Sequence, residues 1–83
     1  MDKIPVALLI GASSESLIAI AHAKKLGLKV VAFDINPAAP GLKEADISYN
    51  EDIANPNKII AILERDGLIP AVILPVPIGR CLN

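Results

Sequence analysis

Four short apolar runs, separated by segments with the pattern of helices or turns, constrain the fold of this chain more than any other feature. The runs are VALLI (6–10), KVVAF (29–33), the weaker DISYN (46–50) and AVILPV (71–76). Strands that are covered on both faces are continuously apolar in this way, whereas strands with one wet face alternate. The runs therefore predict four strands of a sheet that is buried on both sides.

The segment between the first two runs has the start and stop signals of a helix. Ser13 or Ser14 is expected to cap it, Glu15 suits the positive end of its dipole, and Gly27 can end it. Its apolar residues define no single stripe, so we expect this helix to be mostly buried.

The segment between the third and fourth runs has an even clearer helix pattern. Asn55 is expected to be the N-cap, Pro56 the first helical residue and Gly67 the C-terminal stop. Its buried face is expected to contain Ile59, Ile60 and Leu63.

The alternation of these elements predicts the fold class. Residues 41–45 allow at most a short helical turn, so the chain reads strand, helix, strand, short turn, strand, helix, strand. Such alternation indicates an α/β protein with a parallel sheet. We expect a Rossmann-like half-fold, with strand order 3-2-1-4 and helices on both faces. Ligands bind such folds where the strand order reverses, here near GASSES (11–16) and PVPIGR (75–80).

Composition excludes several classes of function. The 83 residues predict one domain, and with one Phe and one Tyr its core must be aliphatic. A net charge of −1 without a basic stripe argues against nucleic-acid binding. No segment has the roughly 18 apolar residues of a membrane span. The single cysteine, Cys81, forms no internal disulfide and is compatible with the reducing cytoplasm. No metal site and no catalytic residue are expected.

The loop after the first strand leaves two interpretations open. It has one glycine, Gly11, where a dinucleotide fingerprint has three. Free amides at a helix start, with the hydroxyls of Ser13 and Ser14, would bind a small anion. Alternatively, these serines only cap the helix. The carboxylate of Glu15 argues against a pyrophosphate at this place.

Asp34 also has two interpretations. It lies 23 residues after Gly11, near the spacing of about 20 at which a dinucleotide-binding fold holds its ribose acid. An Asp before Asn36-Pro37 is equally ordinary turn chemistry.

The order of small motifs along residues 11–46 is a more specific signal. They are Leu26-Gly27, Asp34, Asn36-Pro37, Ala39-Pro40-Gly41 and Ala45-Asp46. Together they resemble the N-terminal domain of the ATP-grasp ligases, and the resemblance continues into PVPIGR. The most similar branch contains the formate-dependent glycinamide ribonucleotide transformylase, the carboxylase ATPase subunit of purine synthesis and carbamoyl-phosphate-synthase-like enzymes.

This resemblance implies that residues 1–83 are the pre-ATP-grasp domain of a longer ligase. Such ligases activate a carboxylate or bicarbonate as an acyl phosphate and pass it to an amine or similar nucleophile. ATP and magnesium would bind the later domains, so this chain alone would be inactive. Asp34 would belong to the turn after the second strand. By resemblance, the acceptor substrate would be positioned by Gly11, Ser13, Ser14, Glu15, Pro75, Val76 and Arg80.

The chain departs from the family pattern after the fourth strand. The purine-synthesis members carry acidic residues there, whereas this chain has Arg80. A guanidinium matches a carboxylate or phosphate, so we expect an anionic acceptor; otherwise Arg80 is a solvated residue. Two rival hypotheses are an NAD(P)-binding half-domain of a dehydrogenase, disfavoured by the missing glycines, and a non-enzymatic small-ligand or partner-binding module.

The expected position of the fourth strand predicts a homodimer. In order 3-2-1-4 this strand is at an edge, which in a complete N-terminal domain the following chain would cover. Pro70, Pro75 and Pro77 lack a backbone donor, but residues 71–74 keep theirs. We therefore expect self-association through the side of the fourth strand.

Overall fold

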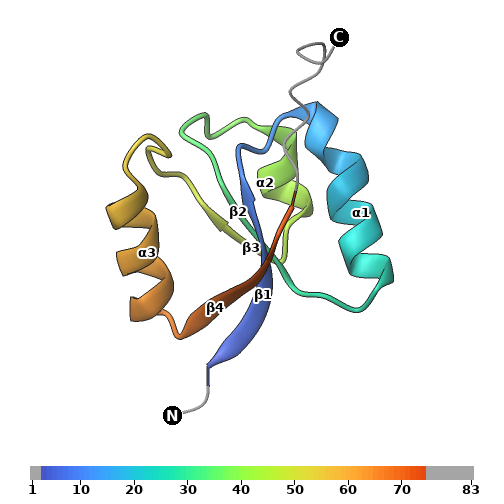
Figure 1. Cartoon of the computed structure of the whole chain (residues 1–83). Helices are drawn as coiled ribbons and strands as arrows, with labels where there is room; N and C mark the ends of the chain where they lie inside the picture. The colour runs from blue at the N-terminus through green and yellow to red at the C-terminus, as the bar shows by residue number, and fades with distance from the viewer. Residues whose placement is uncertain (1–2, 75–83) are drawn as a thin grey trace, which may run out of the picture.

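The strands of the computed structural model form one parallel sheet. The structure describes residues 3–74, apart from the side chain of Glu15. The strand order is β3-β2-β1-β4, which confirms the predicted α/β half-fold (Figure 1). The strands are β1 (Ile4–Ile10), β2 (Val30–Phe33), β3 (Ile47–Tyr49) and β4 (Leu68–Ile73).

Helices cover both faces of this sheet, as predicted. A single turn of 3-10 helix, η1 (Ser14–Ser16), leads into α1 (Leu17–Lys25). The other helices are α2 (Pro40–Glu44) and α3 (Pro56–Arg65). Figure 1 shows α1 and α2 on one side of the sheet and α3 on the other. Within residues 3–74, no helix has the length and apolar character needed to cross a membrane.

Two apolar layers form the core because successive residues of a strand point to opposite faces. In β1, Ala7 and Leu9 pack with Ile20 of α1, whereas Val6 and Leu8 pack toward α3. All four residues of β2 are buried. This burial on both faces explains the continuous apolar runs of the sequence.

The helix α1 is not mostly buried, and that prediction is wrong. Only Ile20 and Ala23 of this helix are buried, while Ile18 is 80% exposed. One narrow side of α1 contacts the sheet, and no described element covers its outer side. The terminating glycine is confirmed, because Gly27 follows the helix with φ +83°.

The predicted start of α3 is confirmed, and one residue of its predicted buried face is wrong. Asn55 is the N-cap, and its side chain accepts hydrogen bonds from the amides of Asn57 and Lys58. The buried residues include Ile62, whereas Ile60 is 52% exposed. At about 100° per residue, Ile60 and Ile62 lie equally far on either side of the pair Ile59 and Leu63. The way α3 sits on the sheet, and not the helical period, therefore decides which of the two is buried.

The strand β4 begins at Leu68, earlier than predicted, directly after Gly67, whose φ is +70°. It is an edge strand that pairs only with β1 within the described residues, and its register shifts between Val6 and Ala7. Pro70 is accommodated because an edge strand tolerates the loss of a ladder donor. Residues 75 and 76, predicted to end this strand, lie outside the described residues.

The cap of α3 gives a stability prediction. Replacing Asn55 with Ala removes the acceptor of two helix-start amides and should lower the free energy of unfolding by about 1 kcal/mol. Asn57→Ala is the matched control, because it changes the same residue type in the same turn and should have an effect within about 0.5 kcal/mol. Urea unfolding followed by circular dichroism measures both; equal losses would contradict the capping role.

Candidate functional site

The candidate site lies at the carboxyl ends of β1 and β2. The loop after β1 begins with Gly11, whose N–H donates to the carbonyl of Phe33 at 2.8 Å. Its φ of +91° is a conformation that glycine adopts without strain. A Cβ at this position would meet nothing within 4 Å. Glycine is therefore required by the backbone conformation and not by a steric clash with neighbouring atoms.

Ala12, the next residue, is held from two sides. Its N–H donates to Oδ2 of Asp34 at 2.7 Å, and its carbonyl accepts from the N–H of Gly41 at 2.7 Å. A Cβ on Gly41 would lie 2.8 Å from both the Cβ and the carbonyl oxygen of Ala12. Only glycine therefore allows this close approach. The loop after β1 is thus fixed to the end of β2 and to the first turn of α2.

Both carboxylate oxygens of Asp34 accept main-chain hydrogen bonds. Oδ1 accepts the N–H of Asn36 at 2.9 Å, in addition to the bond from Ala12 to Oδ2. Asn50, just after β3, donates to the carbonyl of Asp34 at 3.0 Å and to that of Ile35 at 2.7 Å. A ribose clamp uses its carboxylate for sugar hydroxyls, so this geometry favours the turn interpretation of Asp34.

The prediction that Ser13 or Ser14 caps the helix with its side chain is wrong. Ser13 is at the N-cap of η1, but its side chain makes no capping hydrogen bond there. Ser13 has extended backbone, with ψ 172°, and the helix begins after it without a side-chain hydrogen bond. Among residues 3–74 the amides of Ser13 and Ser14 have no hydrogen-bond partner, and both residues are exposed.

Ser16 is a site residue that the sequence interpretation missed. Its side chain is buried, and its hydroxyl donates to the carbonyl of Gly11 at 3.3 Å. This bond ties the first turn of the helix to the glycine that begins the loop. The only sequence signal was a third serine in GASSES, which by itself does not distinguish a buried hydroxyl from an exposed one.

The structure brings together part of the predicted substrate-binding set. Gly11, Ser13 and Ser14 lie on one loop at the carboxyl edge of the sheet. The side chain of Glu15, together with Pro75, Val76 and Arg80, lies outside the described residues. The substrate-binding role of every residue in the set stays a prediction.

Titratable groups near this edge have structural partners. Lys58 forms an ion pair with Glu51 at 2.8 Å, and this hydrogen bond raises the pKa of the ammonium group. Burial, helped by a hydrogen bond to Asp66, raises the pKa of Tyr49 to about 12. The Tyr49 hydroxyl therefore stays protonated at neutral pH.

Within the described part of the chain, no three His, Cys, Asp or Glu side chains are grouped so as to hold a metal ion.

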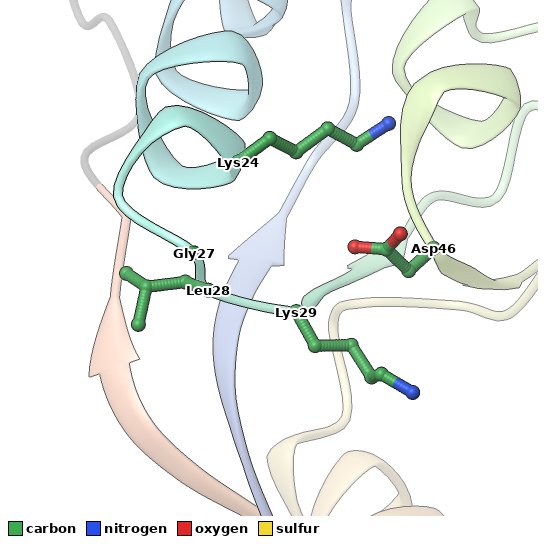
Figure 2. A pocket seen from close by; sticks show the side chains of 5 residues that line it. All are labelled: Lys24, Gly27, Leu28, Lys29 and Asp46. Carbon is green, nitrogen blue, oxygen red and sulfur yellow. The ribbon is translucent and has the colours of Figure 1, made fainter.

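A hollow of about 390 Å³ lies at the opposite end of the sheet from the candidate site. It is lined by Lys24, Gly27, Leu28, Lys29 and Asp46. Figure 2 shows the two lysine side chains extending on either side of the Asp46 carboxylate without converging. Oδ2 of Asp46 accepts the N–H of Val30 at 2.8 Å. This hollow therefore contains a strand-supporting carboxylate and no convergent set of ligand-binding groups.

The strand order and the loop geometry define a Rossmann-like α/β half-fold, with the candidate site in the loop after β1, the strand next to the switch point. In comparisons with known proteins, no family model matches this chain, and no curated protein matches it. Any more specific assignment depends on the residues of the site and on the motif resemblance.

The two bonds of Asp34 can be tested by substitution. In Asp34→Asn only one oxygen remains, so either the amide of buried Ala12 or that of exposed Asn36 loses its acceptor, and the remaining bond loses its charge. Unfolding should therefore require about 1–3 kcal/mol less free energy. Asp52→Asn is the matched control, since Asp52 accepts one amide, that of Ala54 at 2.9 Å, which an Asn oxygen can keep. The midpoints of urea unfolding at pH 7 compare the variants. If Asp34→Asn left the midpoint unchanged, the two hydrogen bonds of Asp34 would contribute little to stability.

Proposed function

We propose that this chain is the N-terminal, substrate-positioning domain of an ATP-grasp ligase. The parent enzyme would activate a carboxylate or bicarbonate as an acyl phosphate and transfer it to an amine or similar nucleophile. The observation that carries the proposal is the engagement of both Asp34 oxygens by loop amides. This engagement is in keeping with the turn role that the ATP-grasp resemblance implies for Asp34.

The chemistry available at the loop supports an anionic acceptor substrate. The exposed Ser13 and Ser14 present two amides and two hydroxyls at the start of η1 and α1. Helix starts of this kind attract carboxylates and phosphates, because their amides point outward and their dipole is positive there. Arg80 would supply a second contact from the segment after β4. Gly11 and Glu15 complete the proposed substrate-positioning set.

ATP and magnesium would be bound by other domains of the parent ligase. The ATP-grasp resemblance assigns the phosphoryl chemistry to those domains, so we assign this chain no step of it. Its role would be to bind and orient the acceptor. A cytoplasmic location is part of the proposal, in keeping with the single cysteine.

A dinucleotide fits this site less well than a small anion. Ala12, Ser13 and Ser14 occupy positions where a closely bound pyrophosphate needs glycines. The amide of Ala12 already donates to Asp34, whose negative charge opposes a pyrophosphate placed there. The dehydrogenase alternative therefore has less support than the ligase domain.

The role of the loop amides can be separated from that of the hydroxyls. Ser14→Pro removes one amide and should keep the fold, because Ser13 is already extended and Ser14 is the first residue of η1. Ser14→Ala keeps the amide and removes only the hydroxyl. Titration with inorganic phosphate at constant ionic strength, followed by amide NMR, should show binding at least about fivefold weaker in Ser14→Pro than in Ser14→Ala.

Two outcomes of this titration would contradict the proposal. Equal phosphate affinity in the two variants, or shifts at the lysines near Asp46 instead of at this loop, would contradict the proposed anion site.

Two further ligands test the class of function. Calorimetric titration with NAD and NADP should give no binding in the low micromolar range, for the steric and electrostatic reasons given for Ala12 and Asp34. The purified chain should also show no magnesium-dependent ATP hydrolysis above a blank. Micromolar NAD affinity would favour a dehydrogenase half-domain, and hydrolysis that Ser14→Pro abolishes would contradict an inactive positioning domain.

A further inference from the structure

The turn between α3 and β4 consists of an Asp-Gly pair, Asp66-Gly67. In such a pair the glycine nitrogen can attack the side-chain carboxyl carbon of the aspartate, because glycine has no Cβ to hinder the approach. The other four aspartates of the sequence are followed by lysine or isoleucine, whose side chains hinder the same attack, and the sequence has no Asn-Gly pair. Asp66 is therefore the residue at which isomerisation of this backbone is chemically easiest.

The reaction is intramolecular and needs only water. The Gly67 nitrogen bonds to Cγ of Asp66 and loses its proton, and a carboxyl oxygen leaves as water, so that a cyclic succinimide forms. Water then adds to the α-carbonyl carbon of the ring, the bond from this carbon to the Gly67 nitrogen breaks, and the nitrogen regains a proton. The product, isoaspartate, has the mass of aspartate. Its backbone runs through Cβ, so the main chain is one carbon atom longer.

Both carboxylate oxygens of Asp66 accept hydrogen bonds in the folded chain. Nε of Arg65 donates to Oδ1 at 3.0 Å, and Nη2 of Arg65 donates to Oδ2 at 3.2 Å. The hydroxyl of Tyr49 also donates to Oδ2. These bonds, chiefly those of Arg65, hold the pKa of the Asp66 carboxyl below its usual value. A carboxylate is attacked less readily than a neutral carboxyl group, because its oxygen is a poorer leaving group.

The backbone of this turn also opposes ring closure. At the ψ of Asp66, 7°, the Gly67 nitrogen nearly eclipses the nitrogen of Asp66 itself and is turned away from its Cβ. The N–H of Gly67 donates to the carbonyl of Glu64 at 3.2 Å, and the carbonyl of Gly67 accepts the N–H of Ile4 at 2.8 Å. Rotation that brings the nitrogen to the carboxyl carbon would disturb both bonds. The attack therefore requires local opening of the turn.

Tyr49 connects the turn to the sheet. Its ring stacks on the ring of Phe33, with centroids 4.8 Å apart, and Phe33 is fully buried in β2. Arg65 is the neighbour of Asp66 in sequence and its side chain is 66% exposed, so its bonds to Asp66 can move with the turn. The bond from Tyr49 cannot, because it joins Asp66 to a different element of the fold.

We propose that Asp66-Gly67 is a latent site of isoaspartate formation, and that the hydrogen bond from Tyr49 keeps it unreactive while the domain is folded. Conversion would lengthen the turn where β4 joins the sheet, because Leu68 directly follows Gly67 and pairs with Ile4 of β1. The converted chain should therefore hold β4 less firmly.

Incubation of the full chain at neutral pH, followed by cleavage after lysine, tests the proposal. Cleavage after Lys58 releases residues 59–83, and reversed-phase chromatography separates the isoaspartate form of this fragment, which has the same mass. Isomerisation at Asp66 should be at least about tenfold slower in the folded chain than in the same chain in guanidinium chloride, because it requires opening of the turn. Equal rates, or no conversion in the denatured chain, would overturn the proposal.

The role of Tyr49 is tested by two variants whose folding is checked by circular dichroism. Tyr49→Phe keeps the stacked ring and removes the hydroxyl, so isomerisation in the folded chain should be at least about threefold faster, with the rate in guanidinium chloride unchanged. Ser48→Ala is the matched control, since it removes another hydroxyl bond of β3, the one to the carbonyl of Leu42 in α2, on the other face of the sheet. It should leave the rate unchanged.

Equal acceleration by the two variants would overturn the role of Tyr49, because it would show an effect of general stability. So would an unchanged rate in Tyr49→Phe. Conversion at Asp52-Ile53 as fast as at Asp66-Gly67 in the denatured chain would overturn the assignment of the site. The comparison of the folded chain with the denatured chain depends on neither variant.

Discussion

The hydrogen bond from the amide of Ala12 to the carboxylate of Asp34 is the contact on which the candidate site depends. It joins the loop after β1 to the end of the neighbouring strand, and the N–H of Gly41 donates to the carbonyl of the same residue, Ala12. The carboxylate takes the place that a bound anion takes at many helix starts. The protein's own anion therefore orients the loop. The next two amides along the chain, those of Ser13 and Ser14, have no hydrogen-bond partner within the described part of the chain.

A second carboxylate acts in the same way at the other end of β2. Asp46 accepts the N–H of Val30 through Oδ2 at 2.8 Å, and its own N–H donates to the carbonyl of Val30 at 2.9 Å. The strand β2 is thus bounded by Asp34 at its end and by Asp46 at its start. Since β2 has four residues and β3 has three, main-chain pairing alone gives few bonds. These side chains extend the connections of a short sheet, as a domain with a small core requires.

Two kinds of feature could be predicted from the sequence: strands that are buried on both faces, and helix ends that are set by a few neighbouring residues. Runs that are apolar at every position identify strands covered on both faces, and Asn55-Pro56 identifies a helix start through the chemistry of one turn. The burial of α1 was not predictable in this way, because it depends on how many helices share a face. The role of Ser16 was hidden for a related reason: its partner, the Gly11 carbonyl, is set by a turn with φ +91° that no pattern of residue types specifies.

The candidate site and the β4 edge use different directions of the same sheet. Loop amides at the strand ends point along the strands, whereas the N–H and carbonyl groups at the edge of a sheet point across them. The self-association that the sequence predicts through the side of the fourth strand would therefore not use the groups of the loop after β1. Ligand binding at Ser13 and Ser14 and self-association through β4 are separate predictions, each of which can fail without the other.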